Sequence, residues 1–536
     1  MATERTPKLK RASFPEEVGV SSEAIKSIIE EFIVNKAEVH SLMILRHGKI
    51  AYESWAYPFT PEMPHIMYSV SKSFTSMAIG FAIEEGLLSL DTKVVDIFPE
   101  YDNKDDENLQ KLTVFHLLTM TAGKIVSPMA DKTKNQWVRD FFTSPWGFAP
   151  DEGWEYISEN QYILSAIIKE VTGETLREYL APRLFRPLGI RENPYWETDG
   201  NGIEAGGWGL FITTEELANF TQCCLNGGKF RNKRVIPKKW VEYATSSLVQ
   251  NTGAFGSTCG DVVSGYGACF WKNGEDRGYR ADGMFSQFGM VFEEFDACLI
   301  LTACEIDEQI PRNCIWKHFD KLFVEESTEP SLEELPSLPK LADLPESKIH
   351  SKYEEILKDK KIVLKPNVAL EVMKFPLSML PMFTTFMSAD KAGYYNNFCL
   401  DFDGDNCIMS WDEKDEHNTI TCAMDGTVAY SPMRLGGVDF TASASACWIN
   451  ETNLFVWVRP LGAIGQRRLR FEFNEDGTAN LYTSTSPDLD KVAVNLSSTV
   501  TKDLKADLTK SIVSNAFTNV APHILEPKHK CRLEDR

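Results

Sequence analysis

The sequence is short of basic residues. Lys and Arg number 56 against 77 Asp and Glu, so the formal net charge is −21. Nucleic acids and anionic membrane surfaces bind to basic faces, and this balance therefore argues against both as partners. No uninterrupted apolar run approaches the roughly 20 residues that a membrane-spanning helix needs. No apolar stretch of signal-peptide length follows the first residues, so we expect a protein that is not exported.

The twelve cysteines lack the spacing of a metal site or of a disulfide framework. None of them forms a Cys-x-x-Cys pair, and the neighbours Cys223 and Cys224 would make a poor disulfide. We interpret the cysteines as free thiols in a reducing compartment, which favours the cytoplasm. The sequence also has no cluster with metal-ligand spacing and no phosphate-binding glycine loop, so we predict neither a metal nor a cofactor.

What the sequence does contain is a strong helical pattern between Tyr68 and Gly86. The spacing of its apolar residues predicts a helix with one buried face, which the glycine ends. Ser69 then lies at the first turn, where backbone N–H groups lack partners, and Lys72 follows three residues later on the same face. The apolar positions that carry the pattern are Phe74, Met77, Ala78, Phe81 and Ala82.

The pair Ser69 and Lys72 suits nucleophilic catalysis. A serine hydroxyl needs a nearby base, and a lysine amine can serve when desolvation or a positive neighbour lowers its pKa. Ser-x-x-Lys is common by itself, and the alternative is a helix cap followed by a surface charge. The buried helix directly behind the pair favours the catalytic interpretation.

Two segments around this helix carry a resemblance to a known family. Residues 68–76, Tyr-Ser-Val-Ser-Lys-Ser-Phe-Thr-Ser, and residues 82–91, Ala-Ile-Glu-Glu-Gly-Leu-Leu-Ser-Leu-Asp, resemble the serine β-lactamase and penicillin-binding-protein superfamily. More narrowly, they resemble its class C β-lactamase-related esterases and peptidases, and the likeness continues through residues 112–123. It implies an α/β (α+β) fold, an antiparallel sheet flanked by helices with a helical subdomain. It also implies that Ser69 is the nucleophile and Lys72 its partner.

The second element of the resemblance is the loop Trp-Glu-Tyr-Ile-Ser-Glu-Asn at residues 154–160. The family carries Tyr-x-Asn or Tyr-x-Ser here, which matches Tyr156 and Ser158. A phenol near the lysine ammonium can have a lowered pKa and shuttle the serine proton, and Ser158 can hydrogen-bond the lysine or the substrate. Two alternatives stay open: Asn160 as the polar partner, and a surface turn in which the tyrosine only packs.

The third element is expected at a strand edge near residues 279–289. The family usually carries Lys-Thr-Gly or His-x-Gly there, whereas this chain has Ala281-Asp282-Gly283. The glycine suits close backbone approach to a substrate carbonyl group. The N–H groups of Ser69 and Met284 would then form the oxyanion hole.

The usual cationic or imidazole side chain is missing from this third element. The altered motif therefore argues against binding of a β-lactam carboxylate, unless Arg277 or Arg280 replaces the cation. Residues 205–210 resemble a family segment that borders the active site, which gives them a weak substrate-lining role.

The chain is too long for one ordinary core. We divide it into a flexible lead (1–20), a β-lactamase-like serine hydrolase domain (21–325), a Pro-, Glu- and Ser-rich linker (326–348) and a C-terminal β-rich domain (349–536). Short alternating runs separated by Asp-Gly turns predict an antiparallel barrel or sandwich in the last part. Two-domain members of the resembling family carry a lipocalin-like domain there.

Together these elements predict a serine hydrolase that cleaves an ester or amide through a Ser69 acyl-enzyme. A carboxylesterase or small-amide hydrolase is preferred to a β-lactamase or D-peptidase, because both an export signal and the usual third motif are missing. Two other hypotheses stay open: a ligand-binding protein that lost catalysis, and a chain whose C-terminal domain supplies the biology. The expected partner is a small-molecule ester, amide or peptide, and the sequence does not give the oligomeric state.

Overall fold

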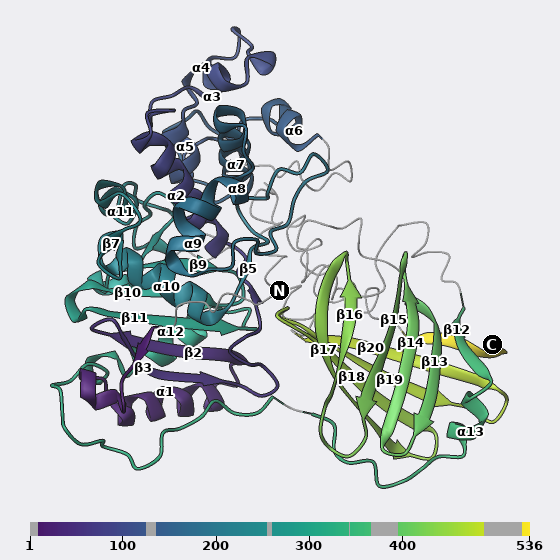
Figure 1. Cartoon of the computed structure of the whole chain (residues 1–536). Coiled ribbons are helices and arrows are strands. Elements are labelled where there is room, and N and C mark those ends of the chain that lie inside the picture. The colour runs from purple at the N-terminus through teal and green to yellow at the C-terminus, as the bar shows by residue number, and fades with distance from the viewer. Residues whose placement is uncertain (1–8, 125–135, 254–259, 342, 366–394, 487–527) are drawn as a thin grey trace, which may run out of the picture. The chain divides into compact units, whose positions relative to one another are not determined.

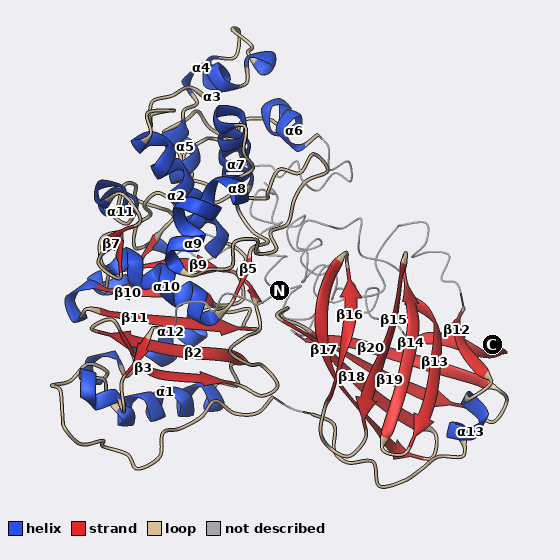
Figure 2. Ribbon diagram, in the orientation of Figure 1, coloured by secondary structure: helices blue, strands red, loops and turns tan. Residues whose placement is uncertain are grey.

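The computed structural model of the chain forms two compact units, Met1–Ala56 with Thr60–Pro339, and Tyr57–Phe59 with Lys340–Arg536. Helices and strands mix in the first unit, whereas strands dominate the second (Figure 2). None of the helices in the described parts has the length and apolarity to cross a bilayer. The residues that the structure describes are 9–124, 136–253, 260–341, 343–365, 395–486 and 528–536.

A seven-stranded sheet forms the centre of the first unit, in the order β1-β3-β2-β11-β10-β9-β8. β1 runs parallel to β3, and the other neighbours are antiparallel. β2 and β3 form a hairpin. The bounds are β1 Lys10–Arg11, β2 Val39–Arg46, β3 Lys49–Trp55, β8 Trp271–Lys272, β9 Tyr279–Gly283, β10 Gln287–Phe292 and β11 Ala297–Ala303.

Helices cover this sheet, whose central strands bury nearly every residue on both faces. α10 (Thr214–Leu225) packs on β10 and β11, and α2 (Val70–Glu84) reaches β9 and β10. α1 (Ser22–Val34) packs against α12 (Gln309–Trp316). The predicted fold class of a sheet flanked by helices is therefore confirmed (Figure 1).

The remaining helices build a helical subdomain around α2, which contacts both α7 and α8. Every residue of α2 from Val70 to Ala82 is buried, so this helix is central rather than one-sided. Gly86, which follows the cap residue Glu85, takes the positive φ of 74° expected of a helix-ending glycine. The helices are α3 Val94–Ile97, α4 Glu107–Lys111, α5 Val114–Thr119, α6 Trp137–Thr143, α7 Glu159–Thr172, α8 Leu176–Leu180, α9 Arg186–Leu188 and α11 Lys238–Ala244.

Two short pieces of sheet complete the first unit. β4 (His65–Ile66) pairs with β5 (Phe211–Ile212), and β6 (Lys229–Phe230) pairs with β7 (Lys233–Arg234). The first pair matters for the site, because it joins the segment before α2 to the glycine-rich loop that ends at residue 210.

The described part of the predicted flexible lead belongs to the first unit. Lys10 and Arg11 form β1, and the Arg11 guanidinium pairs with Glu53 and Glu215. The prediction missed this strand because two residues carry no periodicity. The predicted linker also contacts the sheet, since the Leu338 N–H donates to the Ser54 hydroxyl oxygen at 3.0 Å.

The described residues of the second unit form a ten-stranded, up-and-down β-sheet in which β15 also pairs with β17, and this extra pairing closes it into a barrel. The predicted C-terminal antiparallel barrel is therefore confirmed, and its Asp-Gly turns join β13 to β14, β15 to β16 and β19 to β20. Its likeness to lipocalins stays a prediction. The elements are α13 Tyr353–Leu357, β12 Lys360–Leu364, β13 Tyr395–Asp403, β14 Asn406–Glu413, β15 Glu416–Ala423, β16 Ala429–Leu435, β17 Val438–Asn450, β18 Asn453–Leu461, β19 Gln466–Phe473, β20 Thr478–Ser486 and β21 His529–Asp535.

The described cysteines, eleven of the twelve, are all free thiols. Ten of these eleven are buried, and Cys399 is partly exposed. For these eleven residues the interpretation of the cysteines as free thiols is confirmed.

Candidate active site

Ser69 lies immediately before α2, at the end of a strained turn. Its neighbour Tyr68 has a φ of 43°, a left-handed conformation that is unfavourable for a bulky side chain. Such strain persists only where the surroundings impose it. Here the Met67 N–H donates to the Leu210 carbonyl oxygen at 2.8 Å, which ties the turn to the loop before β5.

Lys72 lies one helical turn beyond Ser69 and points back at it. The Nζ atom donates to the Ser69 Oγ atom at 2.8 Å, to the Ser158 Oγ atom at 2.9 Å and to the Gly207 carbonyl oxygen at 2.7 Å. The side chain is only 1% exposed, and this burial lowers its pKa to about 7. A substantial fraction of Lys72 is therefore neutral near pH 7 and able to accept a proton.

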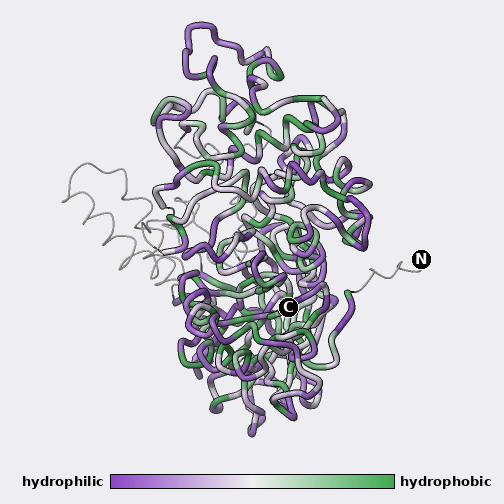
Figure 3. The backbone as a smooth tube through the Cα atoms, turned by 90° about the vertical axis from the view of Figure 1, so that its left-hand side faces the viewer, coloured by the Kyte–Doolittle hydropathy of each residue, from purple (hydrophilic) through white to green (hydrophobic). Residues whose placement is uncertain are grey.

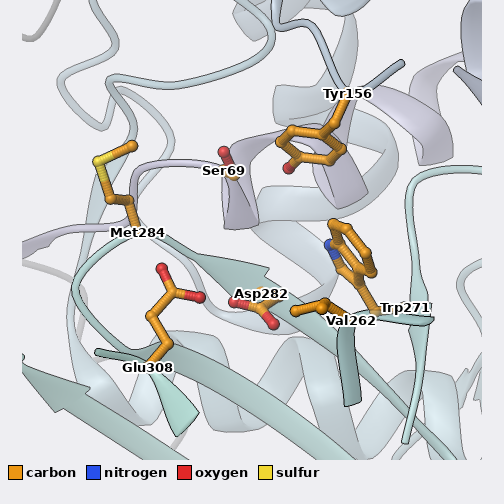
Figure 4. Close-up of a pocket in the computed structure, with 7 residues that line it drawn as sticks. All are labelled: Ser69, Tyr156, Val262, Trp271, Asp282, Met284 and Glu308. Atoms are coloured by element: carbon orange, nitrogen blue, oxygen red, sulfur yellow. The ribbon is translucent and has the colours of Figure 1, made fainter. Parts of the chain in front are cut away.

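Tyr156 approaches the same serine from the loop before α7. Figure 4 shows its hydroxyl group pointing toward Ser69. Burial raises the pKa of Tyr156, and its hydrogen bond with the Ser69 side chain only partly opposes this rise. The expectation of a lowered pKa is therefore wrong. The nearby lysine is itself desolvated, and the ring packs among Trp154, Tyr266 and Trp271.

Ser158 is the residue before the first turn of α7, and its hydroxyl oxygen accepts from Lys72. Asn160, the alternative partner, is buried elsewhere, with its Nδ2 atom 3.5 Å from the Met120 sulfur. The geometry thus favours Tyr156-x-Ser158 as the register that meets the lysine.

Gly207 is a site residue that the sequence reasoning placed only as weakly substrate-lining. Its carbonyl group binds the Lys72 amine, and a Cβ atom at this position would lie 2.7 Å from the Ser158 carbonyl oxygen. Only a glycine lets the loop come this close to the start of α7. The run Gly-Gly-Trp-Gly at residues 206–209 was the signal for such an approach.

The end of β9 lies against the segment before Ser69. A Cβ atom on Gly283 would lie 2.3 Å from the Met67 carbonyl oxygen, so the close approach requires glycine. Within the described ranges, neither the Ser69 N–H nor the Met284 N–H donates to a backbone carbonyl group. Ala281 is buried in the sheet and does not line the pocket.

Neither arginine of the third element replaces the missing cation. Arg280 is completely buried, and its Nε atom donates to the Asp282 Oδ2 atom at 2.6 Å. Arg277 pairs with Glu275 and lies over the ring of Trp316. Both guanidinium groups are therefore engaged by other residues of the chain, and neither arginine lines the pocket.

A small pocket opens beside the serine (Figure 4). Sequence reasoning missed three of its residues, because they belong to no motif and only the tertiary fold brings them here. The lining includes two carboxyl groups and, among the described residues, no basic side chain. The residues that line it are Ser69, Tyr156, Val262, Trp271, Asp282, Met284 and Glu308.

Comparisons with known proteins identify the family to which this chain belongs. The family model for beta-lactamase matches residues 27–303, more than half of the chain, which confirms the resemblance to that superfamily. A 6-aminohexanoate-dimer hydrolase from Paenarthrobacter ureafaciens is 24% identical over 256 residues, which cover 44% of this chain and 65% of that protein. A lovastatin esterase from Penicillium rubens is 28% identical over 172 residues, which cover 27% of this chain and 43% of that protein.

A solved penicillin-binding protein homolog from Caulobacter crescentus aligns with a TM-score of 0.46 at 15% identity, over 56% of this chain and 99% of its own. By contrast, the chain spans only about half to two thirds of the first curated relatives that it matches.

Proposed function

This chain belongs to the beta-lactamase family of serine hydrolases, and within it we propose a carboxylesterase or small-amide hydrolase that works through a Ser69 acyl-enzyme. The observation that carries the proposal is the 2.8 Å hydrogen bond between Lys72 Nζ and Ser69 Oγ, made by a lysine whose pKa is lowered to about 7. The register Tyr156-x-Ser158 supports a place in the class C-related branch.

Acylation begins when neutral Lys72 takes the Ser69 proton while Oγ attacks the substrate carbonyl carbon. Ser158 and Gly207 keep the amine in position through their hydrogen bonds to Nζ. The N–H groups of Ser69 and Met284 stabilise the negative charge on the carbonyl oxygen.

Tyr156 protonates the leaving group. Because its pKa is raised, the phenol carries its proton in the resting enzyme and can give it to the departing alkoxide or amine. The Lys72 ammonium, whose Nζ lies 4.9 Å from the centre of the tyrosine ring, then returns a proton to the phenolate. Water attacks the acyl carbon and gives one proton to neutral Lys72; the bond between that carbon and Ser69 Oγ then breaks, and the Lys72 ammonium returns the proton to Oγ.

The pocket favours an ester or small amide over a β-lactam or a D-peptide. Both of the latter substrates carry a carboxylate, and Asp282 and Glu308 present carboxyl groups to the pocket. The negative charge of Asp282 therefore opposes the binding of such a substrate. The free thiols of the eleven described cysteines support the cytoplasm as the proposed location.

Labelling with a fluorophosphonate probe tests the proposal. We expect intact mass spectrometry to show a single adduct on the wild type and none on Ser69→Ala. Ser89→Ala, which removes an exposed hydroxyl from a surface turn, is the matched control and should keep the adduct. An equal adduct on Ser69→Ala, or unchanged ester turnover by that variant, would show that Ser69 is not the nucleophile.

A further inference from the structure

The wall of the pocket opposite Tyr156 carries an incompletely paired carboxylate. Asp282 is 8% exposed, and its Oδ2 atom accepts from Arg280 Nε at 2.6 Å and from Arg312 Nη1 at 3.1 Å. Its Oδ1 atom accepts no hydrogen bond from any residue in the described ranges. Since Asp282 lines the pocket, this oxygen is available to a ligand there.

The charges around Asp282 do not balance. Three carboxyl groups, those of Asp261, Asp282 and Glu308, surround the guanidinium groups of Arg280 and Arg312. The Arg312 Nη1 atom lies 3.1 Å from Asp282 Oδ2 and 3.7 Å from Glu308 Oε2. The Nε atom of the same residue lies 3.7 Å from Asp261 Oδ2. Burial and the Asp282 charge raise the pKa of Glu308, so protonation of Glu308 compensates for the cation that the cluster lacks.

An aromatic wall faces these carboxyl groups. Trp271 lines the same pocket, with its ring centre 5.1 Å from that of Tyr156. Figure 4 shows the Glu308 carboxyl group beside that of Asp282, with the Trp271 indole across from them. Carboxylates on one side and an aromatic face on the other are the groups that attract an organic cation.

We propose that the substrate of this enzyme supplies the missing cation, as a protonated or quaternary amine close to the scissile carbonyl group. The amine lies between Asp282 Oδ1 and Glu308 and against Trp271, while the carbonyl carbon is at Ser69. This inference rests on the proposed function, because it takes the pocket as the place where the acyl or alcohol part of the substrate binds.

Matched pairs of esters that differ only in charge test the proposal. In the first pair the charge is in the acyl part: p-nitrophenyl 4-(trimethylammonio)butyrate against p-nitrophenyl 5,5-dimethylhexanoate. In the second it is in the alcohol: acetylcholine against 3,3-dimethylbutyl acetate. We expect kcat/KM to favour the cationic ester by about tenfold or more in at least one pair. Equal rates, or a preference for the neutral ester in both pairs, would overturn the inference.

Glu308→Gln removes, with little change of shape, a carboxyl group that a bound cation would ionise, and we expect it to lower the cationic preference several-fold. The measured quantity is the ratio of kcat/KM for the cationic ester to kcat/KM for the neutral ester, and a general loss of activity leaves this ratio unchanged. Glu294→Gln is the control, since this exposed glutamate lies past the opposite end of β10 and should leave the ratio unchanged. An unchanged ratio in Glu308→Gln would contradict the assigned role of this residue.

Ser69→Ala separates the two proposals. If that variant hydrolyses the esters as fast as the wild type, the proposed function fails and the inference falls with it. If hydrolysis depends on Ser69 but ignores the substrate charge, only the inference fails. If the wild type hydrolyses neither pair, the rate of Ser69 labelling by a neutral fluorophosphonate is measured with and without tetramethylammonium. Protection supports the cation site, and unaltered labelling overturns it.

Discussion

Replacing Lys72 by methionine should change the pH dependence of stability in a calculable way. Lys72 is completely buried, and its pKa falls from 10.5 to about 7 on folding. Between these two values the unfolded chain binds a proton that the folded protein does not, so the wild type gains stability as the pH rises. The cost of burying the amine is complete below pH 7 and has vanished above pH 10.5.

The size of this effect follows from the two pKa values. Lowering a pKa from 10.5 to about 7 corresponds to about 5 kcal/mol, at 1.36 kcal/mol for each pH unit. Integrated between pH 7 and pH 9, the wild type should gain about 2 kcal/mol that Lys72→Met does not gain. Lys72→Met also loses three hydrogen bonds, which lowers its free energy of unfolding by the same amount at every pH. The gain of the wild type over the variant between pH 7 and pH 9 is therefore unaffected.

Hydrogen-exchange mass spectrometry in graded urea can follow peptides of α2, which report the unfolding of the first unit alone. The control is Lys26→Met, which removes an exposed lysine of α1. We expect the free energy of unfolding of Lys26→Met, plotted against pH, to run parallel to that of the wild type. The difference in this free energy between the wild type and Lys72→Met should instead change between pH 7 and pH 9. Parallel curves for both variants would refute the idea of a desolvated lysine, and with it the assignment of Lys72 as the base.

Three further predictions concern the reaction and its scaffold. For the wild type, kcat/KM for a neutral ester should rise with pH through an apparent pKa near 7, because only neutral Lys72 takes the proton; a flat profile from pH 6 to pH 9 would contradict this. Tyr156→Phe should slow alkyl esters roughly 100-fold but p-nitrophenyl esters much less, because a good leaving group needs no protonation; equal losses would exclude Tyr156 as the acid. Gly283→Ala places a Cβ atom 2.3 Å from the Met67 carbonyl oxygen. We therefore expect the free energy of unfolding, measured by urea titration, to fall by about 1–3 kcal/mol and acylation to be slower. Wild-type stability and acylation rate in this variant would disprove the close approach.

The local parts of this architecture follow from the sequence. An apolar repeat after Lys72 predicted α2, and a three-residue spacing on a helix already places the lysine beside Ser69. Short alternating runs separated by Asp-Gly turns predicted the barrel. In each case neighbouring residues decide the structure, so the pattern is visible without any tertiary contact.

The rest of the pocket depends on strand register, which the sequence does not display. Asp282 pairs with Phe288, and Phe288 pairs with Leu301, so β9 and β11 flank β10 and end on the same side of the sheet. The chain leaves β11 at that edge and brings Glu308 to Asp282. No local pattern marks Glu308 for this role, and the raised pKa of Tyr156 is equally a property of its buried surroundings.

These surroundings link substrate charge to catalysis. Burial is the main cause of the raised pKa of Tyr156, and the charge of the Asp282 carboxylate raises it further. A substrate cation beside Asp282 would offset the field of this carboxylate and make the tyrosine a stronger acid at the moment when the leaving group needs a proton. Binding energy of this kind acts on the chemical step, so the preference for a cation should appear in kcat as well as in KM. A cation that improved KM alone would place its binding site outside the influence of Tyr156.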